Sequence, residues 1–226
     1  MVAPADSIVH LLKSARCVVF DVDSTLIQEE GIDVLADFCG VGKQVAELTS
    51  QAMGGAVPFQ VALKQRLDLI KPSAQNIHDC LQQHPPHLTS GVKELVEMLK
   101  ACGVDVYVVT GGFRQMIAPV IDELEIAADH VFANQILFEN ETGSYAGFDD
   151  KALTSQSGGK GKAVALIKAK HENAVTIMVG DGITDLEARP PADMFIGFGG
   201  NVRRQAVQER ADWFVTSFSE VIAALQ

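Results

Sequence analysis

The sequence predicts an α/β fold in which a parallel sheet carries helices on both faces and a small helical segment is inserted after the first strand. Two observations lead to this prediction. From about residue 87 onward, short apolar runs rich in β-branched residues alternate with segments whose apolar residues recur at helical spacing, which is the pattern of parallel strands joined by crossover helices. Residues 32–84 instead show helical spacing throughout, which indicates an all-helical block between the first two strands.

The first half of the chain contains one strand followed by this helical block. The run CVVF at 17–20 fits a buried strand, and the polar turn DVDST follows it at once. Glycines and Pro72 separate four helical stretches, and Ser73 is a suitable N-cap for the last of them. We therefore predict a core domain formed by residues 1–30 and 87–226 and a helical insert formed by residues 31–86.

The second half of the chain alternates between helices and strands. Helical spacing covers residues 91–103, 113–126, 161–171, 184–193, 201–211 and 219–226, and strands are expected at 104–109, 175–179, 194–198 and 213–216. Residues 131–139 and 144–149 are expected to form a small hairpin, with Gly143 as its turn residue.

The composition indicates a globular protein with a sizeable core. The chain has 226 residues, of which 47% are hydrophobic and 21% are charged, and this excludes a disordered or low-complexity chain. The formal net charge is −11. Because nucleic acids and anionic membrane surfaces bind clustered cations, neither is an expected partner.

The cysteines and the N-terminal residues indicate a reducing environment. Cys17, Cys39, Cys80 and Cys102 form no C-x-x-C pair and match no zinc-site spacing, so we expect free thiols. Residues 1–16 lack the uninterrupted apolar stretch of a secretory signal. The expected location is therefore cytoplasmic.

Acidic residues follow two of the predicted strands, at the point where each strand ends. Asp21 and Asp23 come directly after the first strand, and Asp181 follows a later one, with Asp185 four residues on. Ligands of open α/β sheets bind at the carboxyl ends of the strands, and carboxylates two residues apart on an extended chain share a face. Carboxylates gathered there would repel one another without a cation. Because hard oxygen ligands suit Mg²⁺, the sequence predicts a magnesium site.

Two glycine-rich stretches supply groups that can hold an anion. Thr110, Gly111 and Gly112 follow the second strand and are expected to open a helix, which offers a hydroxyl group and free backbone N–H groups. The run SGGKGK brings Lys160 to the start of another helix. A lysine that reaches an acidic metal centre suggests a negatively charged substrate group. Neither SGGKGK nor GFGGN completes a nucleotide-binding motif.

The motifs D-x-D-S-T, T-G-G, G-G-K-G and G-D-G-x-T-D follow one another in this order along the chain. With them, the sequence resembles the haloacid-dehalogenase superfamily of phosphohydrolases, and it closely resembles the eukaryotic branch that acts on phosphoserine. The similarity covers nearly the whole chain, through the stretches FDVDSTLIQEEGID, AMGGAVPF, TGGFR, VFAN, YAGFD, SGGKGK, GDGITDLEA and PPADMFIGFGGNVRRQ. It implies a Rossmann-like parallel sheet (HAD-like core), with the helical insert as the cap domain of the family.

The resemblance also implies the chemistry of the acidic residues. Asp21 would be the nucleophile that forms an aspartyl phosphate, and Asp23 would act first as the general acid and then as the general base. Mg²⁺ would be bound by Asp21, the backbone carbonyl of Asp23 and Asp181. Asp185 would orient groups near the metal.

The same resemblance implies which groups bind the substrate. Thr110 and Lys160 would hold the phosphoryl oxygens, and Thr110 keeps the hydroxyl group of the serine that many family members carry there. Glu30 would bind the ammonium group of O-phosphoserine, and Arg66 would bind its carboxylate. The other positions that would line or support the pocket are Met53, Gly54, Gly111, Gly112, Asn134, Thr184 and Arg204.

The predicted function is Mg²⁺-dependent hydrolysis of O-phospho-L-serine to L-serine and phosphate, the last step of serine biosynthesis. An alternative keeps the chemistry and changes the substrate, as in a phosphatase or phosphotransferase that acts on another small phosphate monoester. A non-catalytic interaction protein on the same fold is disfavoured, because Asp21, Asp23, Lys160 and Asp181 are all present. The expected partner is a small molecule, and a homodimer is left open.

Overall fold

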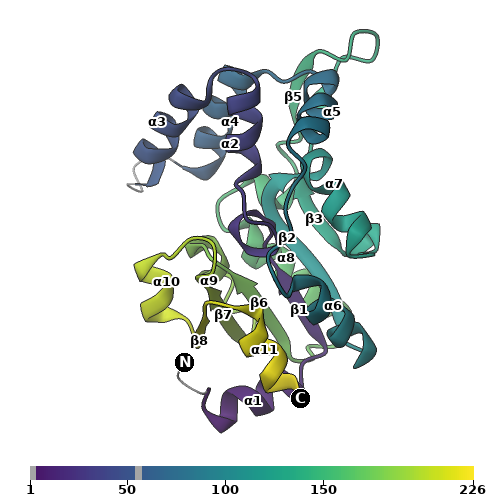
Figure 1. Ribbon diagram of the computed structural model, residues 1–226, viewed down its shortest axis with the longest axis vertical. Helices are drawn as coiled ribbons and strands as arrows, with labels where there is room; N and C mark the ends of the chain where they lie inside the picture. Colours follow the sequence, from purple (N-terminus) through teal and green to yellow (C-terminus); the bar gives the residue numbers. More distant parts are fainter. Residues whose placement is uncertain (1–3, 54–57) are drawn as a thin grey trace.

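The computed structural model describes residues 4–53 and 58–226 and contains one six-stranded parallel sheet (Figure 1). Its strands are β1 (Cys17–Phe20), β2 (Asp105–Phe113), β3 (Val131–Asn134), β6 (Thr176–Gly180), β7 (Met194–Phe198) and β8 (Trp213–Val215). Their order across the sheet is β3-β2-β1-β6-β7-β8. This topology confirms the predicted fold class. It also makes neighbours of β2, β1 and β6, the three strands that lead into the T-G-G, D-x-D and G-D-G motifs.

Helices cover both faces of the sheet, because side chains alternate between two apolar layers along each central strand. In β1, Val18 and Phe20 face one layer, and Cys17 and Val19 face the other. The helices of the first layer are α1 (Asp6–Lys13), α6 (Val92–Ala101), α7 (Arg114–Glu123) and α11 (Phe218–Leu225). The helices of the second layer are α8 (Gly159–Lys170), α9 (Ile183–Leu186) and α10 (Gln205–Arg210).

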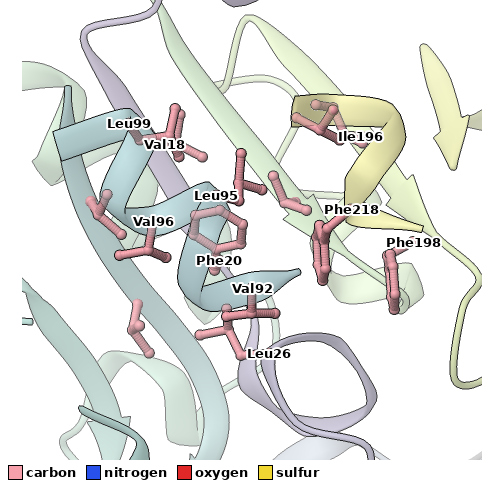
Figure 2. Packing of buried hydrophobic residues seen from close by; sticks show 14 of the residues in the cluster. Val18, Phe20, Leu26, Val92, Leu95, Val96, Leu99, Ile196, Phe198 and Phe218 are labelled. Atoms are coloured by element: carbon pink, nitrogen blue, oxygen red, sulfur yellow. The ribbon is translucent and has the colours of Figure 1, made fainter. Parts of the chain in front are cut away.

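Aromatic packing stabilises the ends of β1 and β7. Figure 2 shows the ring of Phe198 facing that of Phe218, with Phe20 of β1 next to Leu95 of α6. The Phe198 and Phe218 rings stack with their centroids 4.3 Å apart, and Phe20 meets Phe218 edge to face at 6.3 Å. Aromatic pairs at such distances contribute about 0.5–1.5 kcal/mol beyond their buried area. This packing fixes the ends of β1 and β7, so the loops that follow these strands begin at well-defined positions.

Between β1 and α6, the described residues form four α-helices at the end of the molecule opposite to α1 and the C-terminus (Figure 1). They are α2 (Gly31–Phe38), α3 (Gly42–Met53), α4 (Phe59–Ile70) and α5 (Ala74–Gln83). Leu35, Leu63 and Leu67 are buried in the apolar cluster that these helices share. An antiparallel hairpin of β4 (Ile136–Phe138) and β5 (Tyr145–Phe148) packs against the same cluster. The helical insert thus shares its core with a hairpin from the second half of the chain.

In these elements, one local expectation from the sequence is wrong and one helix was not predicted. Residues 131–134 were expected in the hairpin, but they form β3 and pair with β2 in the main sheet, where Val131 and Ala133 are buried. The helix α1 was not expected at all, and Leu12 is its one buried residue. Across the ranges 4–53 and 58–226, no helix combines the length and the apolar character that a membrane span requires.

Candidate active site

The chain turns sharply where β1 ends, and this turn holds Asp21. Residues Val22–Leu26, directly after Asp21, form a wide helical turn in which Ser24 has a φ of 53°. It is here called the nucleophile turn, after the role that the sequence predicts for Asp21. The carboxylate of Asp21 accepts a hydrogen bond of 2.8 Å from the N–H group of Val22. Because β1 ends at Phe20, the turn and not the alternation of a strand sets the positions of Asp21 and Asp23.

Lys160 links two buried carboxylates. Its Nζ atom lies 2.7 Å from Oδ2 of Asp21 and 2.6 Å from Oδ1 of Asp185. Gly158, with a φ of 70°, leads into α8 and places Lys160 in the first turn of this helix. Burial opposes the charged form of Lys160, but the two carboxylates more than offset this effect, so its pKa is raised. The ammonium group is therefore charged at neutral pH.

Three carboxylates meet at the carboxyl ends of β1 and β6. Asp21, Asp181 and Asp185 each place an oxygen atom within 4.8 Å of the others. Burial raises the pKa of Asp181, and the charge of Asp21 adds to this shift while Arg204 opposes it. The pKa of Asp185 is raised well above its usual range, again by burial first and by Asp21 second. Hard oxygen atoms that repel one another in this way are suited to a divalent cation.

The carboxyl group of Asp23 is held toward the helical insert. Its Oδ1 atom accepts a hydrogen bond of 2.8 Å from the N–H group of Gly31, the first residue of α2. Burial raises the pKa of Asp23 to about 8, and the charges of Glu30 and Asp21 add to the shift. A Cβ atom on Gly112 would come within 2.9 Å of Oδ2 of Asp23, so a side chain there would push against this carboxyl group. At neutral pH this group is a carboxylic acid that can give up a proton.

The T-G-G stretch lies in the last residues of β2, and not at the start of a helix as the sequence suggested. The register between β2 and β3 shifts at this point, and α7 begins only at Arg114. Oγ1 of Thr110 accepts a hydrogen bond of 2.9 Å from the N–H group of Gly112. Thr110 is completely buried, so its hydroxyl group is fixed beside the two glycines.

Asn134 supports the T-G-G stretch through its amide group. Its Nδ2 atom donates a hydrogen bond of 2.8 Å to the carbonyl oxygen of Gly111. Its Oδ1 atom accepts one of 2.8 Å from the hydroxyl group of Thr154. Asn134 is completely buried. Both ends of its amide are therefore used within the protein, and this favours a supporting role over direct contact with a ligand.

Arg204 connects the acidic cluster to Glu30. Its Nε atom lies 2.9 Å from Oδ2 of Asp181, and its Nη2 atom lies 3.3 Å from Oε1 of Glu30. The hydroxyl group of Ser24 donates a hydrogen bond of 2.8 Å to the same oxygen of Glu30. Burial raises the pKa of Glu30, and the Ser24 hydrogen bond opposes the shift. Glu30, directly before α2, is therefore tied to both the nucleophile turn and the acidic cluster.

Arg66 brings a cation from the insert toward this acidic region. It lies in α4, is half-buried, and its Nε atom donates a hydrogen bond of 3.2 Å to the carbonyl oxygen of Ala62. Burial lowers the pKa of its guanidinium group. The carboxylates of Asp33, Glu30 and Asp23 oppose this shift, so they lie within electrostatic range of the cation.

Some predicted residues lie outside this network, and others were missed. Thr184 is exposed in α9. Gly54 lies outside the described residues, as does the side chain of Met53 at the end of α3. Thr25 was not predicted, although it belongs to the D-x-D-S-T motif, and its hydroxyl group donates a hydrogen bond of 3.2 Å to Asp181. Phe59 was also missed. Its ring lies 3.2 Å from where a Cβ atom on Gly111 would stand, and this proximity depends on how the insert folds back over the sheet.

Comparisons with known proteins identify the family of this chain. The family model of the haloacid dehalogenase-like hydrolases matches residues 15–193. The phosphoserine phosphatase of Bos taurus is 54% identical over 217 residues, which cover 96% of both chains.

Solved structures share the fold. DsGPDH of Dunaliella salina is 35% identical with a TM-score of 0.87; the match covers 100% of this chain, which spans 38% of that chain. A phosphoserine phosphatase solved as an analogue of its phospho-aspartyl intermediate is 26% identical with a TM-score of 0.80, and the match covers 94% of this chain and 100% of that one. The chain therefore belongs to the haloacid dehalogenase-like hydrolases and, within them, to the family of the phosphoserine phosphatases, which are phosphoric monoester hydrolases.

Proposed function

We propose that the protein is a Mg²⁺-dependent phosphatase that hydrolyses O-phospho-L-serine to L-serine and phosphate through an aspartyl phosphate on Asp21. One observation carries this proposal. The carboxylate of Asp21 lies at the end of the central strand, 2.7 Å from the ammonium group of Lys160 and beside the carboxylates of Asp181 and Asp185. The names of the relatives support the choice of substrate. Such an enzyme would catalyse the last step of serine biosynthesis.

In the first half of the reaction, a carboxylate oxygen of Asp21 would attack phosphorus, and the bond between phosphorus and the seryl oxygen would break. Asp23 would pass its proton to the leaving seryl oxygen. Its pKa of about 8 supports this role, because the group still carries the proton at neutral pH. Lys160, the hydroxyl group of Thr110 and the backbone of Gly111 and Gly112 would hold the phosphoryl oxygens, on which negative charge accumulates.

In the second half of the reaction, Asp23 would take a proton from a water molecule that attacks phosphorus. The bond between phosphorus and Asp21 would then break, which releases phosphate and restores both carboxyl groups. A group with a pKa close to the working pH suits both steps, because it can lose and regain a proton at little cost.

The residues present fit a Mg²⁺ ion. The carboxylates of Asp21 and Asp181 and the backbone carbonyl of Asp23 would hold it, and Asp185 would orient the groups around it. The raised pKa values of Asp181 and Asp185 support this assignment: burial raises each of them first and the charge of Asp21 second, and a divalent cation would offset both effects. When bound, Mg²⁺ would offset the negative charges that Asp21 and the phosphate bring together.

The amino-acid end of the substrate would meet groups from both sides of the site. Glu30 would bind the ammonium group and Arg66 the carboxylate. Met53, Gly54, Thr184 and Arg204 are the further residues that we propose for the pocket, on the resemblance alone. We propose that residues 31–86 act as a cap over the sheet. Two contacts support this: Phe59 of α4 lies close above Gly111, and the hydroxyl group of Ser157 lies 3.1 Å from Oε1 of Gln60.

We also propose that the enzyme is cytoplasmic and that it acts on a small molecule, and not on nucleic acid or membranes. Its four cysteines are free thiols, as the sequence predicted, and reduced thiols are typical of the cytoplasm. A homodimer is compatible with it.

The proposal is tested by measuring phosphate release from L-phosphoserine with and without Mg²⁺. The same assay is run on phosphothreonine, glycerol phosphate and p-nitrophenyl phosphate, with Asp21→Asn as the inactive control. We expect L-phosphoserine to give the highest kcat/KM, and only with Mg²⁺. A higher kcat/KM for another monoester would favour the alternative substrate class. No release from L-phosphoserine in the presence of Mg²⁺ would overturn the proposal.

A further inference from the structure

The two chain segments that connect the sheet to the helical insert run side by side. The first comprises residues 26–29 and the second residues 87–89; together they are here called the hinge ribbon. Ile27 and Leu88 are bridged as antiparallel neighbours. The N–H group of Thr89 donates to Leu26 at 2.8 Å, and that of Gln28 donates to His87 at 3.0 Å. Any movement of the insert relative to the sheet must therefore act on this ribbon.

One side chain from a distant segment reaches both strands of the hinge ribbon and the nucleophile turn. Nδ2 of Asn201 lies 3.2 Å from the carbonyl oxygen of Ser24, 3.1 Å from that of Ile27 and 2.7 Å from Oγ1 of Thr89. An amide group has two N–H bonds, so it serves two of these acceptors fully or all three by sharing. Ser24 is completely buried with a φ of 53°, a strained conformation that surrounding contacts must maintain.

The loop that carries Asn201 is itself held firmly. It leaves β7 through two glycines, and a Cβ atom on Gly200 would come within 2.3 Å of the Phe198 ring and 2.7 Å of the Thr216 carbonyl oxygen. The Phe198 ring is stacked on Phe218 (Figure 2). Three residues after Asn201, Arg204 contacts Asp181 and Glu30. One short segment therefore contacts the hinge ribbon, the acidic cluster and Glu30.

We propose that Asn201 is a positioning residue that holds the hinge ribbon against the nucleophile turn and thereby sets where Glu30 stands relative to Asp21. Glu30 lies directly beyond the ribbon, so a shift of the ribbon moves it. This inference rests on the proposed function, in which Glu30 binds the ammonium group of phosphoserine. Loss of Asn201 should therefore harm a substrate that carries an ammonium group more than one that carries only a phosphate ester.

The first test is amide hydrogen exchange of the metal-free protein and needs no activity. In Asn201→Ala, residues 26–30 and 86–90 should exchange about 5- to 30-fold faster, because anchoring hydrogen bonds are lost, while β6 and β7 keep their rates. Asn76→Ala is the matched control, since Asn76 belongs to the capping box of α5 inside the insert. It should affect exchange in α5 and leave the ribbon unchanged. Unchanged exchange of the ribbon in Asn201→Ala would overturn the proposal.

The second test compares kcat/KM for phosphoserine and p-nitrophenyl phosphate. Asn201→Ala should lower the first about 10- to 100-fold, as expected for a misplaced binding group, and the second by a clearly smaller factor, because p-nitrophenyl phosphate has no ammonium group to misplace. Thr89→Ser keeps the accepting hydroxyl group and should match the wild type, whereas Thr89→Val should show a smaller loss that is also selective for phosphoserine. Equal losses on both substrates would overturn the positioning role. If the wild type does not hydrolyse phosphoserine, the proposed function fails, and the exchange experiment still decides the role of Asn201 in the hinge.

Discussion

Lys160 and Asp185 form an ion pair of 2.6 Å in which the side chain of Asp185 is completely buried. The same ammonium group lies 2.7 Å from Asp21. One cation therefore balances two carboxylates that would otherwise face each other inside the protein. Breaking a buried pair by removing one partner is costly, because the remaining charge is left without compensation. Lys160 thus stabilises the fold at these carboxylates and, in the proposed reaction, binds the phosphoryl group.

Lys160→Ala should lower both stability and activity. We expect the free energy of unfolding of the metal-free protein to fall by about 3–5 kcal/mol, and kcat/KM to fall about 1,000-fold on phosphoserine and on p-nitrophenyl phosphate alike. Adding Asp185→Asn to this variant should recover part of the stability, because one uncompensated carboxylate disappears. Denaturant unfolding and steady-state kinetics measure these effects. Lys162→Ala, an exposed change in the same helix, is the control, and wild-type stability of Lys160→Ala would contradict the argument.

Removal of Mg²⁺ should abolish hydrolysis. The crowded carboxylates of Asp21, Asp181 and Asp185 motivate this expectation. Excess chelator should stop phosphate release and Mg²⁺ should restore it, whereas Ca²⁺ should support it poorly because it prefers more ligands at longer distances. Mg²⁺ should also raise the Tm of the wild type, by mass action on the folded state, but not that of Asp181→Asn. Full activity in excess chelator would show that the metal has no role.

Asp21→Asn and Asp23→Asn should fail at different steps. An amide is a poor nucleophile, so Asp21→Asn should form no covalent phosphoenzyme. Asp23→Asn lacks the acid and the base, but an aryl phosphate has a leaving group that needs no proton, so this variant should form the phosphoenzyme and then stall. Acid quenching with labelled aryl phosphate distinguishes the two. A labelled adduct that persists in Asp21→Asn would mean that another residue is the nucleophile.

Asp23 should make the folded protein less stable as the pH rises. Its pKa is about 8 in the folded state and 3.8 as the ordinary value. Between these values the folded state binds more protons than the unfolded state, so the contribution of this group to stability is lost as the pH rises through this window. In the metal-free protein, Asp23→Asn should have a Tm close to that of the wild type near about pH 4.5. Near about pH 9 it should gain roughly 3–5 kcal/mol, because each pKa unit of the shift is worth about 1.4 kcal/mol, and this corresponds to about 6–20 °C. Calorimetry measures the Tm values. If the wild type and Asp23→Asn had the same Tm at both pH values, the raised pKa of Asp23 would be contradicted.

The part of the site that the sequence predicted is the part encoded by short motifs at strand ends. Asp21, Thr110 and Asp181 follow apolar runs that were recognisable as strands, and the strand order β2-β1-β6 makes the three strand ends neighbours. Their convergence needs only the rule that ligands of a parallel sheet bind at its carboxyl edge. For the same reason the fold class was predictable and is confirmed.

The contacts that the sequence did not reveal join segments that lie far apart in the chain. Asn201 is 112 residues from Thr89 and 177 from Ser24, and no local periodicity marks it. The strand conformation of the T-G-G stretch depends on a shift in the pairing of β2 with β3. A glycine-rich sequence alone does not specify such a shift. Such features follow from tertiary packing, whereas the strands and most helices follow from local patterns.

Arg66→Ala should harm hydrolysis of phosphoserine selectively. Arg66 is the cation that the insert brings into electrostatic range of Glu30 and Asp23, and a phosphoserine carboxylate would bind its planar guanidinium group through two hydrogen bonds. Losing a charged partner in a closed site costs about 2–4 kcal/mol, or roughly 30- to 1,000-fold in kcat/KM. A simple aryl phosphate has no carboxylate to lose, so its kcat/KM should change by less than about 3-fold.

Two further variants sharpen this comparison. One separates the charge of Arg66 from its shape, and the other is a control on the same helix. Arg66→Lys keeps the charge but not the planar fork, so it should recover only part of the activity on phosphoserine. Lys64→Ala removes an exposed cation of the same helix, which is paired with Asp68 at 2.6 Å, and it should leave both substrates unchanged. The measurement is kcat/KM for all three variants on both substrates. Equal losses on the two substrates in Arg66→Ala would remove the carboxylate-binding role and favour another phosphate monoester as the substrate.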